Sequence, residues 1–301
     1  MGINILVIGI GGNALLNPNN IQNFDEQNTT IKYITKTITD LSKKYKIVIT
    51  HGNGTQIGDE LIKNLNSDVG RLPLYLLNAE TQASIGSNLE LSINNMKPKR
   101  EFITIITHVL VSKNDKAFKN PKKPIGPFLN KNKFIKEFKS KNIDYIIKHN
   151  KYRMVVPSPQ PLDILEIDAI REILNQHNVI CGGGGGIPVY KEKMNYKGID
   201  AVIDKDFTTQ LIANKLKSKR MIILTDIDYV YKDINNTKSK ITEINIKELK
   251  KIINTFEEGT IKPKLESCIK FIENGGELAQ IGNLNKLDEI INKKSGTIIK
   301  Y

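Results

Sequence analysis

Residues 178–189 read NVICGGGGGIPV, an apolar run followed by five consecutive glycines, Gly182 to Gly186, and a second apolar run. Because glycine has no side chain, such a run lets consecutive backbone N–H groups face one concavity and lets a ligand approach the main chain. A flexible linker is the alternative interpretation, but linkers are usually flanked by polar or Ser-rich segments, not by strand-like runs. The pattern therefore favours an anion-binding loop at the end of a strand.

Two more apolar runs end in glycine turns. The run over residues 3–10 is followed by Gly11 and Gly12, and the run over residues 46–50 is followed by HGNG at 51–54. Each turn precedes a helix-compatible segment, so the order strand, glycine turn, helix repeats as it does in parallel α/β sheets. Such sheets bind ligands beyond the carboxyl ends of their strands. None of the three turns matches the Walker A pattern or the dinucleotide fingerprint. We therefore predict an α/β fold whose glycine turns meet at one phosphate-handling cleft.

The size and composition of the chain allow a large hydrophobic core. It has 301 residues, of which 39% are hydrophobic, which suits one large α/β domain or two closely associated lobes. No run of eighteen apolar residues is present and no basic region precedes the first apolar run, so we expect neither a membrane-spanning helix nor a signal peptide. Cys181 and Cys268 are too few and too scattered for a disulfide framework or a zinc site, so we expect a reduced, cytoplasmic protein.

The formal charge of +13 is concentrated in one segment. Between Lys113 and Arg153 there are 13 Lys or Arg residues against 3 Asp or Glu. We interpret residues 113–156, which also contain several prolines, as an inserted, protruding lid subdomain. Its charge suits the steering of small anions toward the cleft, and it also suits nucleic-acid binding. Nucleic acid would require stacking aromatics, whereas Phe134 and Phe138 have the helical spacing of a core stripe, so this partner is not expected.

The remaining pattern predicts alternating strands and helices. No repeat at a solenoid period interrupts it. Strands are expected at residues 3–9, 46–50, 102–107, 178–181, 221–225, 278–281 and 297–299, and helices at residues 27–45, 55–65, 79–93, 164–176, 207–216, 246–255 and 263–274.

Three lysines stand in contexts that surface lysines rarely have. Lys123 lies in a segment stiffened by prolines, Lys205 is bracketed by two aspartates at an expected helix start, and Lys264 follows a proline at another helix start. Phosphoryl transfer builds negative charge on the transferred oxygens, so lysines that converge from separate loops suit that reaction. Taken singly, each is also explained as a solvated or capping-region lysine.

Other polar residues near the predicted cleft have two interpretations each. Asp206 either stabilises the first turn of its helix or fixes active-site lysines. Asp226 and Asp228, in the sequence TDID after an apolar strand, either meet a nucleotide or magnesium or serve ordinary turn chemistry. We interpret His51 as a turn-stabilising residue and not as a general base, because phosphoryl transfer to an anionic acceptor needs no base.

These motifs together resemble those of the carbamate kinases, within the amino-acid kinase superfamily. The resemblance covers essentially the whole chain, and the stretch at 119–128 is highly specific. The matching stretches are GGNAL at 11–15, THGNG at 50–54, AFKNPKKPIGPF at 117–128, VVPSP at 155–159, the glycine run with IPV, and AVIDKD at 201–206.

The resemblance implies a single amino-acid kinase domain over residues 1–301. Its fold would be a three-layer α/β/α sandwich with a mainly parallel, eight-stranded central sheet, and the segment 113–156 would protrude over the cleft. The implied activity is reversible phosphoryl transfer between carbamoyl phosphate and ADP, giving ATP and carbamate, with Mg²⁺ accompanying the nucleotide. The resemblance also implies a homodimer, and no membrane partner is expected.

The resemblance further implies roles for individual residues. Lys123 and Lys205 would bind the transferred phosphoryl group, Lys264 would bind the nucleotide phosphates, and Asp206 would organise the lysines. The implied substrate-binding positions are Gly11, Gly12, Asn13, Gly52, Asn53, Gly54, Gly183 and Gly184. The implied nucleotide-binding positions are Gly185, Thr225, Asp226, Asp228, Tyr231, Gly259 and Lys264. No residue is assigned as a metal ligand.

The chain departs from the family pattern at four places. Thr55 and Tyr75 stand where a proline and an aspartate are usual, Gln160 replaces a common lysine, and the glycine run is one residue longer than expected. Two other hypotheses stay open. One is a superfamily kinase that acts on another small acid or phosphate, and the other is a catalytically silent regulatory or nucleic-acid-binding homologue.

Overall fold

An eight-stranded sheet forms the centre of the computed structural model, which describes residues 4–12, 34–68, 70–138, 143–233, 236–257 and 259–301. The strand order is β15-β17-β16-β12-β1-β2-β9-β3. All neighbouring strands are parallel except β16 and β17. The predicted mainly parallel sheet is thus confirmed. The strand bounds are β1 (Ile5–Ile10), β2 (Lys46–His51), β3 (Phe102–Thr104), β9 (Asn178–Ile180), β12 (Arg220–Thr225), β15 (Glu243–Asn245), β16 (Leu278–Asn283) and β17 (Thr297–Lys300).

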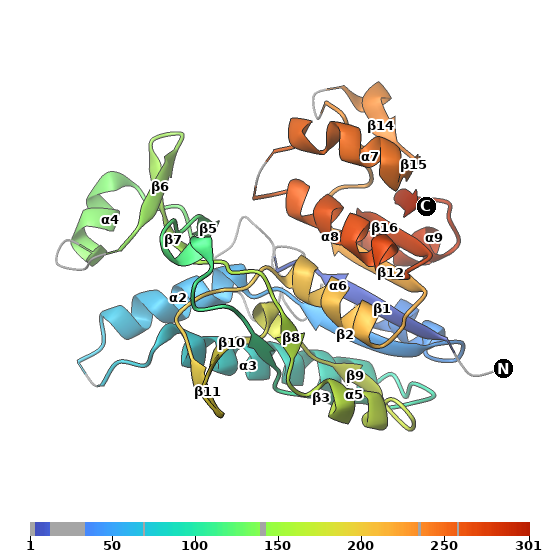
Figure 1. The fold of residues 1–301 in the computed structure, drawn as a ribbon, viewed down its shortest axis with the longest axis horizontal. Coiled ribbons are helices and arrows are strands. Elements are labelled where there is room, and N and C mark those ends of the chain that lie inside the picture. The colour runs from blue at the N-terminus through green and yellow to red at the C-terminus, as the bar shows by residue number, and fades with distance from the viewer. Residues whose placement is uncertain (1–3, 13–33, 69, 139–142, 234–235, 258) are drawn as a thin grey trace.

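Helices cover both faces of this sheet (Figure 1). One face packs against α5 (Ile167–Ile173), α6 (Lys205–Lys215), α7 (Ile246–Ile252) and α8 (Lys262–Glu273). The other face packs against α3 (Leu74–Asn94), α9 (Leu287–Ile291) and the helical residues 34–41. Within the described residues, no helix combines the length and apolar character needed to cross a membrane.

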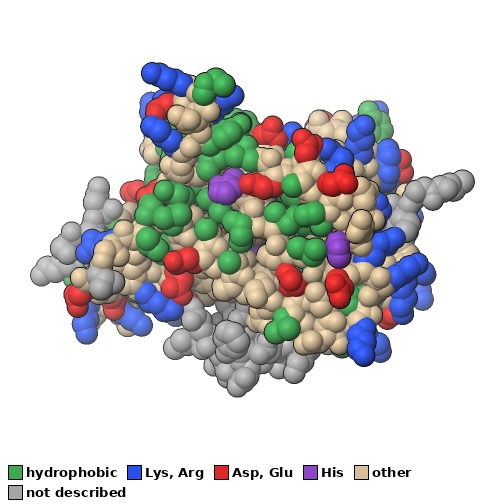
Figure 2. Space-filling model, turned by 90° about the horizontal axis from the view of Figure 1, so that it is seen from below, with side chains coloured by type: hydrophobic (Ala, Val, Ile, Leu, Met, Phe, Trp, Pro, Cys, Tyr) green, Lys and Arg blue, Asp and Glu red, His purple; other side chains and the backbone are tan. Residues whose placement is uncertain are grey.

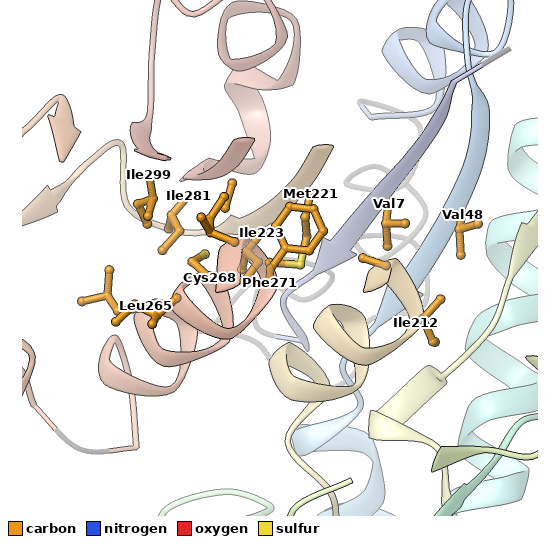
Figure 3. Close-up of a cluster of buried hydrophobic side chains, with 14 of the residues drawn as sticks. Val7, Val48, Ile212, Met221, Ile223, Leu265, Cys268, Phe271, Ile281 and Ile299 are labelled. Carbon is orange, nitrogen blue, oxygen red and sulfur yellow. The ribbon is translucent and has the colours of Figure 1, made fainter. Parts of the chain in front are cut away.

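Strand β1 shows why the sheet needs a layer on each side. Val7 packs into one buried cluster, whereas Leu6, Ile8 and Ile10 pack into another. Successive residues of a strand point to opposite faces, so a strand that is apolar at consecutive positions must be covered twice. Figure 3 shows Val7 in the first cluster, where strand side chains meet those of α6 and α8. The expected three-layer α/β/α sandwich is therefore confirmed.

The strand expected at residues 102–107 is shorter in the structure. It ends at Thr104. The N–H of Ile105 still donates to Ile180 O at 2.8 Å, but the N–H of Thr107 donates to Gln82 Oε1 at 2.6 Å. The chain instead enters a second sheet, in the order β11-β10-β4-β8. Its strands are β4 (His108–Leu110), β8 (Asp163–Ile164), β10 (Ile187–Glu192) and β11 (Asn195–Gly198).

Two expected helices have different bounds. The helix expected at 164–176 is reduced to α5, because Ile164 pairs with β4 and the N–H of Leu165 donates to His108 O at 3.1 Å. Helix α3 starts before its expected first residue, directly after Pro73, whose fixed φ suits a helix start. The first part of the helix expected at 27–45 lies outside the described residues.

The segment 113–156 carries a small sheet of its own, which lies at the upper left of Figure 1. It contains α4 (Lys131–Phe138) and the strands β5 (Lys123–Pro124), β6 (Tyr145–Lys148) and β7 (Lys151–Val156). Phe134 and Phe138 are buried and form an aromatic group with Tyr145 and Tyr152, with ring centroids 4.9–5.4 Å apart. The interpretation of these two phenylalanines as a core stripe is confirmed.

Candidate active site

A cavity of about 690 Å³ lies at the carboxyl ends of β1, β2 and β12. The turn after β1 contributes Gly11 and Gly12, and the turn after β2 contributes Gly52, Asn53 and Gly54. The two turns touch, because a Cβ on Gly52 would lie 2.6 Å from the backbone nitrogen of Gly12. Only glycine permits this approach. The prediction that these two turns meet in one cleft is confirmed.

The five-glycine run reaches the same cavity from β9. All five glycines are buried, and four of them have positive φ. Gly184 lines the cavity with φ 63°, and a Cβ there would lie 2.2 Å from Asn53 Nδ2. The run is therefore a packed loop and not a linker. Gly183 and Gly185 are buried in it, but neither is among the described residues that line the cavity.

Buried polar side chains of α3 hold the glycine turns in place. Asn53 Nδ2 donates to Asn78 Oδ1 at 2.6 Å and to Thr81 Oγ1 at 2.9 Å, and Asn78 Nδ2 donates to Gly186 O at 2.6 Å. Sequence reasoning missed Asn78, Thr81 and their neighbour Gln82. Their signal is a polar spacing of three and four residues on a helix face that is otherwise buried.

Three lysines converge on this cavity from separate elements. Lys205 begins α6, Lys264 lies in the first turn of α8, and Lys123 begins β5. Asp206 accepts from two of them: Lys264 Nζ lies 3.1 Å from Asp206 Oδ2, and Lys205 Nζ pairs with Asp206 Oδ1. Lys123 Nζ pairs with Asp204 Oδ2. The structure thus brings together the three lysines and the aspartate that the sequence singled out.

Asp204 has two roles that sequence reasoning did not assign. It is the N-cap of α6, where its extended backbone lets Oδ1 accept from the N–H of Asp206 at 3.0 Å. Its other carboxylate oxygen accepts from Lys123, whose strand belongs to the segment 113–156. The same side chain therefore starts the helix and holds the lysine of the protruding segment.

Burial and the neighbouring charges act in opposite directions on the pKa values of Asp206, Lys205 and Lys264. Burial acts to raise the pKa of Asp206, but the charges of Lys205 and Lys264 outweigh it and hold that pKa well below its usual value. Burial lowers the pKa of Lys205, and Asp206 opposes this effect. For Lys264, burial acts to lower the pKa, but Asp206 and Asp204 together raise it.

The other end of the cavity carries the predicted nucleotide positions Thr225, Asp226, Tyr231 and Gly259. Thr225 Oγ1 donates to Asp226 Oδ1 at 3.0 Å. Asp228 is not among the described residues of the lining, and its carboxylate instead pairs with Lys286 Nζ at 2.8 Å. Asn13 lies outside the described residues. Lining residues that sequence reasoning did not assign include Arg153, Ile203, Asp204, Phe256, Glu257 and Ile261.

His51 is buried beneath the turn after β2. Burial lowers the pKa of His51 to about 4, and its Nδ1 lies 3.3 Å from Gly52 O. The side chain is therefore neutral at pH 7, and it is not among the described residues that line the cavity. This agrees with the interpretation of His51 as a turn-stabilising residue.

Three of the four departures from the family pattern, Thr55, Tyr75 and Gln160, lie outside the described lining of the cavity. The ring of Tyr75 packs on Gly198, where a Cβ would lie 2.4 Å from the ring. Gln160 Oε1 accepts from Lys270 Nζ at 2.8 Å. Neither Tyr75 nor Gln160, nor Thr55 in the first turn of α2 (Gly54–Leu65), is among the described lining residues. These three side chains therefore do not enter the described lining in which the lysine cluster lies.

The described residues contain no group of three or more His, Cys, Asp or Glu side chains that could hold a metal ion. Carboxylates do line the nucleotide end of the cavity, where Asp226, Asp233 and Glu257 lie. Mg²⁺ in phosphoryl-transfer sites is usually held by one or two carboxylates, substrate phosphates and water. The donor set therefore fits a magnesium ion that arrives with a nucleotide and does not fit a closed protein cage.

The chain is similar to known proteins over nearly its whole length. Residues 4–283 match the model of the amino acid kinase family. The carbamate kinase of Staphylococcus haemolyticus is 38% identical over 98% of this chain and 99% of its own, and that of Thermoplasma volcanium is 37% identical over 98% of each. The solved structure of carbamate kinase from Giardia lamblia bound to citric acid superposes with a TM-score of 0.91, at 31% identity over 99% of this chain and 98% of that one. The same enzyme bound to AMP-PNP gives a TM-score of 0.88 at 32% identity, over 99% of this chain and 98% of that one.

The fold and the converging lysines, together with these matches, place the chain in the amino acid kinase family. Within that family it belongs to the carbamate kinases, a class of phosphotransferases. The resemblance inferred from the sequence motifs is confirmed.

Proposed function

We propose that this protein transfers a phosphoryl group reversibly between carbamoyl phosphate and ADP, giving ATP and carbamate. The observation that carries the proposal is the convergence of Lys123, Lys205 and Lys264, with Asp206 between two of them, on one cavity. Phosphoryl transfer requires positioning and positive charge more than any covalent contribution from the protein. A cluster of fixed lysines beside backbone amides supplies both.

Each charged residue takes one part of the work in this proposal. Lys123 and Lys205 bind the transferred phosphoryl oxygens, and Lys264 binds the nucleotide phosphates. Asp206 fixes Lys205 and Lys264 before the substrates arrive, so little reorganisation is needed in the transition state. The glycine turns provide N–H groups toward the phosphoryl group and the carbamate.

The nucleotide and its metal ion occupy the end of the cavity lined by Thr225, Tyr231 and Gly259 in this proposal. Asp226 follows β12 directly and lines this end of the cavity. Its carboxylate is suited to bind a Mg²⁺ ion that also binds the nucleotide phosphates. When bound, the ion supplies positive charge that offsets the charge of those phosphates. Thr225 Oγ1 orients the Asp226 carboxylate by donating to it.

We also propose a cytoplasmic homodimer in which the segment 113–156 acts as a lid. Figure 2 shows hydrophobic side chains gathered on the face that lies at the bottom of Figure 1, with Lys and Arg mostly toward its edges. Helix α3 contributes exposed leucines to the surface, including Leu76 and Leu91, the latter 63% exposed. Exposed apolar groups of this kind favour contact with another protein surface. Light scattering of the purified protein would detect the dimer, and a monomer at micromolar concentration would contradict it.

The test of substrate is ATP formation from ADP and Mg²⁺ with different phosphoryl donors. The proposal expects rapid turnover with carbamoyl phosphate, much slower turnover with acetyl phosphate, and loss of turnover when a chelator removes the metal. If a folded, ADP-binding protein uses acetyl phosphate or another acyl phosphate faster than carbamoyl phosphate, the kinase acts on another small acid. No turnover with any donor would favour a catalytically silent homologue.

A further inference from the structure

Arg153 differs from the other buried or half-buried cations of the cavity. It lies on β7, lines the cavity, and is largely withdrawn from water. Its Nε donates to Gly126 O at 2.8 Å, and its guanidinium carbon lies 5.0 Å from the centroid of the Phe128 ring. These contacts use one of the five N–H groups of the guanidinium and leave its terminal nitrogens for another partner.

Within the described residues, the charge of Arg153 is not neutralised by a carboxylate. Lys123, Lys205 and Lys264 each pair with an aspartate, whereas no Asp or Glu among the described residues forms an ion pair with Arg153. Burial lowers the pKa of Arg153, with no carboxylate opposing that effect, yet an arginine remains charged at any physiological pH. Withdrawing a charged group from water is unfavourable unless a counter-ion is present. The half-buried guanidinium of Arg153 is therefore available to an anion that enters the cavity.

The position of Arg153 indicates which anion this is. Gly126, its partner, donates its N–H to Gly54 O at 2.9 Å, so the guanidinium lies beside the turn after β2. The nucleotide positions follow β12, which is two strands away in the sheet order β12-β1-β2, or about 10 Å. Helix α2 starts at Gly54 and has no acidic residue in its first turn, so its positive end is also uncompensated.

We propose that Arg153 binds the phosphate oxygens of carbamoyl phosphate, which in the reverse direction are the oxygens of the γ-phosphate of ATP. The planar guanidinium presents parallel N–H groups to two oxygens, a geometry that lysine does not reproduce. Arg153 then contributes to the affinity for carbamoyl phosphate, whereas Lys264 binds the nucleotide phosphates. The identity of the bound substrate rests on the proposed function, whereas the presence of an anion site at Arg153 does not.

The experiment compares steady-state kinetics of wild type, Arg153→Met and Arg153→Lys, with KM measured separately for carbamoyl phosphate and for ADP. Loss of a charged hydrogen-bonding partner is expected to raise KM for carbamoyl phosphate about 10-fold to 100-fold, while KM for ADP changes by less than about threefold. Arg153→Lys should recover only part of the loss. Lys151→Met is the matched control, because it removes an exposed positive charge from the same strand and should leave both constants unchanged.

A purely structural role for Arg153 would give a different result. If it served only to hold Gly126 and the segment 113–156, Arg153→Met would lower kcat and leave KM for carbamoyl phosphate near the wild-type value, which would overturn the proposal. Equal increases in both KM values would also overturn it. In an Arg153→Ala variant, added guanidinium ion should restore part of the affinity for carbamoyl phosphate if the guanidinium group of Arg153 binds the anion.

Calorimetry with inorganic phosphate tests the anion site independently of the reaction. Wild type should bind phosphate at least about tenfold more tightly than Arg153→Met, whether or not carbamoyl phosphate proves to be the substrate. Tighter binding by wild type, together with no turnover of carbamoyl phosphate, would contradict the proposed function and support the anion site. Equal phosphate binding by the two proteins would overturn the anion site.

Discussion

The two walls of the cavity are built differently. One wall is made by the glycine turns and the start of α6, where Asp206 and Lys205 are buried and braced by several hydrogen bonds. The other wall belongs to the segment 113–156, which contributes Lys123 and Arg153 from a small, partly exposed sheet. We infer that the first wall holds its charged side chains in fixed positions. The second wall adds the cations Lys123 and Arg153 from a separate small sheet.

The largest expected difference between the walls concerns the two aspartates at the start of α6. Asp206→Asn leaves Lys205 and Lys264 buried without their counter-ion, so we expect a loss of about 3–5 kcal/mol in the free energy of unfolding. Asp204→Asn keeps a side chain that caps helices well, removes the counter-ion of Lys123, whose side chain is 24% exposed, and weakens the electrostatic support of Lys264, so a smaller loss of about 1–2 kcal/mol is expected. Urea unfolding of both variants measures the two losses, and equal values would refute the contrast between the walls.

The glycine loop gives the next largest effect. Gly184→Ala places a side chain at φ 63° and 2.2 Å from Asn53 Nδ2, which should cost about 3 kcal/mol of stability and most of the activity. Gly70→Ala is the control, because a Cβ there meets nothing within 4 Å. Thermal unfolding and turnover of the two variants should separate them clearly. A Gly184→Ala enzyme with wild-type activity would show that the loop adapts and is not fixed.

The buried His51 makes the fixed wall sensitive to acid. The pKa of His51 falls from 6.5 to about 4 on folding because of burial, so the neutral form is favoured in the folded protein. Its contribution to stability is complete above pH 6.5 and is lost as the pH falls toward 4. Between pH 7 and pH 4.5 we expect a loss of roughly 2–3 kcal/mol that a folded His51→Gln variant lacks. Parallel pH profiles for the two proteins would contradict this assignment.

The smallest effect is expected where the segment 113–156 meets the loop before α8. Lys148 Nζ lies 3.1 Å from Glu257 Oε1, and both side chains are more than half exposed. Exposed ion pairs of this kind contribute about 1 kcal/mol or less. Lys148→Met should therefore change the free energy of unfolding by less than about 1 kcal/mol, and added salt should remove the difference. A larger, salt-resistant loss would show that the segment is fixed as firmly as the opposite wall.

The sequence predicted the fixed wall better than the protruding one. Apolar strands followed by glycine turns, as at Gly11 and Gly52, specify a parallel sheet and the edge at which ligands bind. These local patterns are sufficient because each strand and its turn are contiguous in the chain. The convergence of Lys123 with Lys205 is not local, since it depends on how a separate small sheet packs against the main one.

The residues that sequence reasoning missed share this dependence on tertiary contacts. Asp204 looks like an ordinary helix cap until Lys123 is placed beside it. Asn78 and Thr81 look like polar residues of an exposed helix face until the glycine turns pack on them. Arg153 is one of many basic residues in its segment, and only the absence of a carboxylate among its described neighbours distinguishes it. Apart from the polar spacing of three and four residues on α3, none of these relations follows from periodicity or spacing.

The most direct test of the account is the rate of ATP formation from carbamoyl phosphate and ADP with Mg²⁺ by wild type and by Lys205→Ala. Lys43→Ala serves as the matched control, because Lys43 is a surface lysine that is 62% exposed. We predict that Lys205→Ala lowers kcat by about 10³-fold while the protein stays folded and still binds ADP, and that Lys43→Ala has wild-type activity. A folded Lys205→Ala enzyme that keeps near-wild-type turnover would contradict the central claim that the lysine cluster performs the transfer.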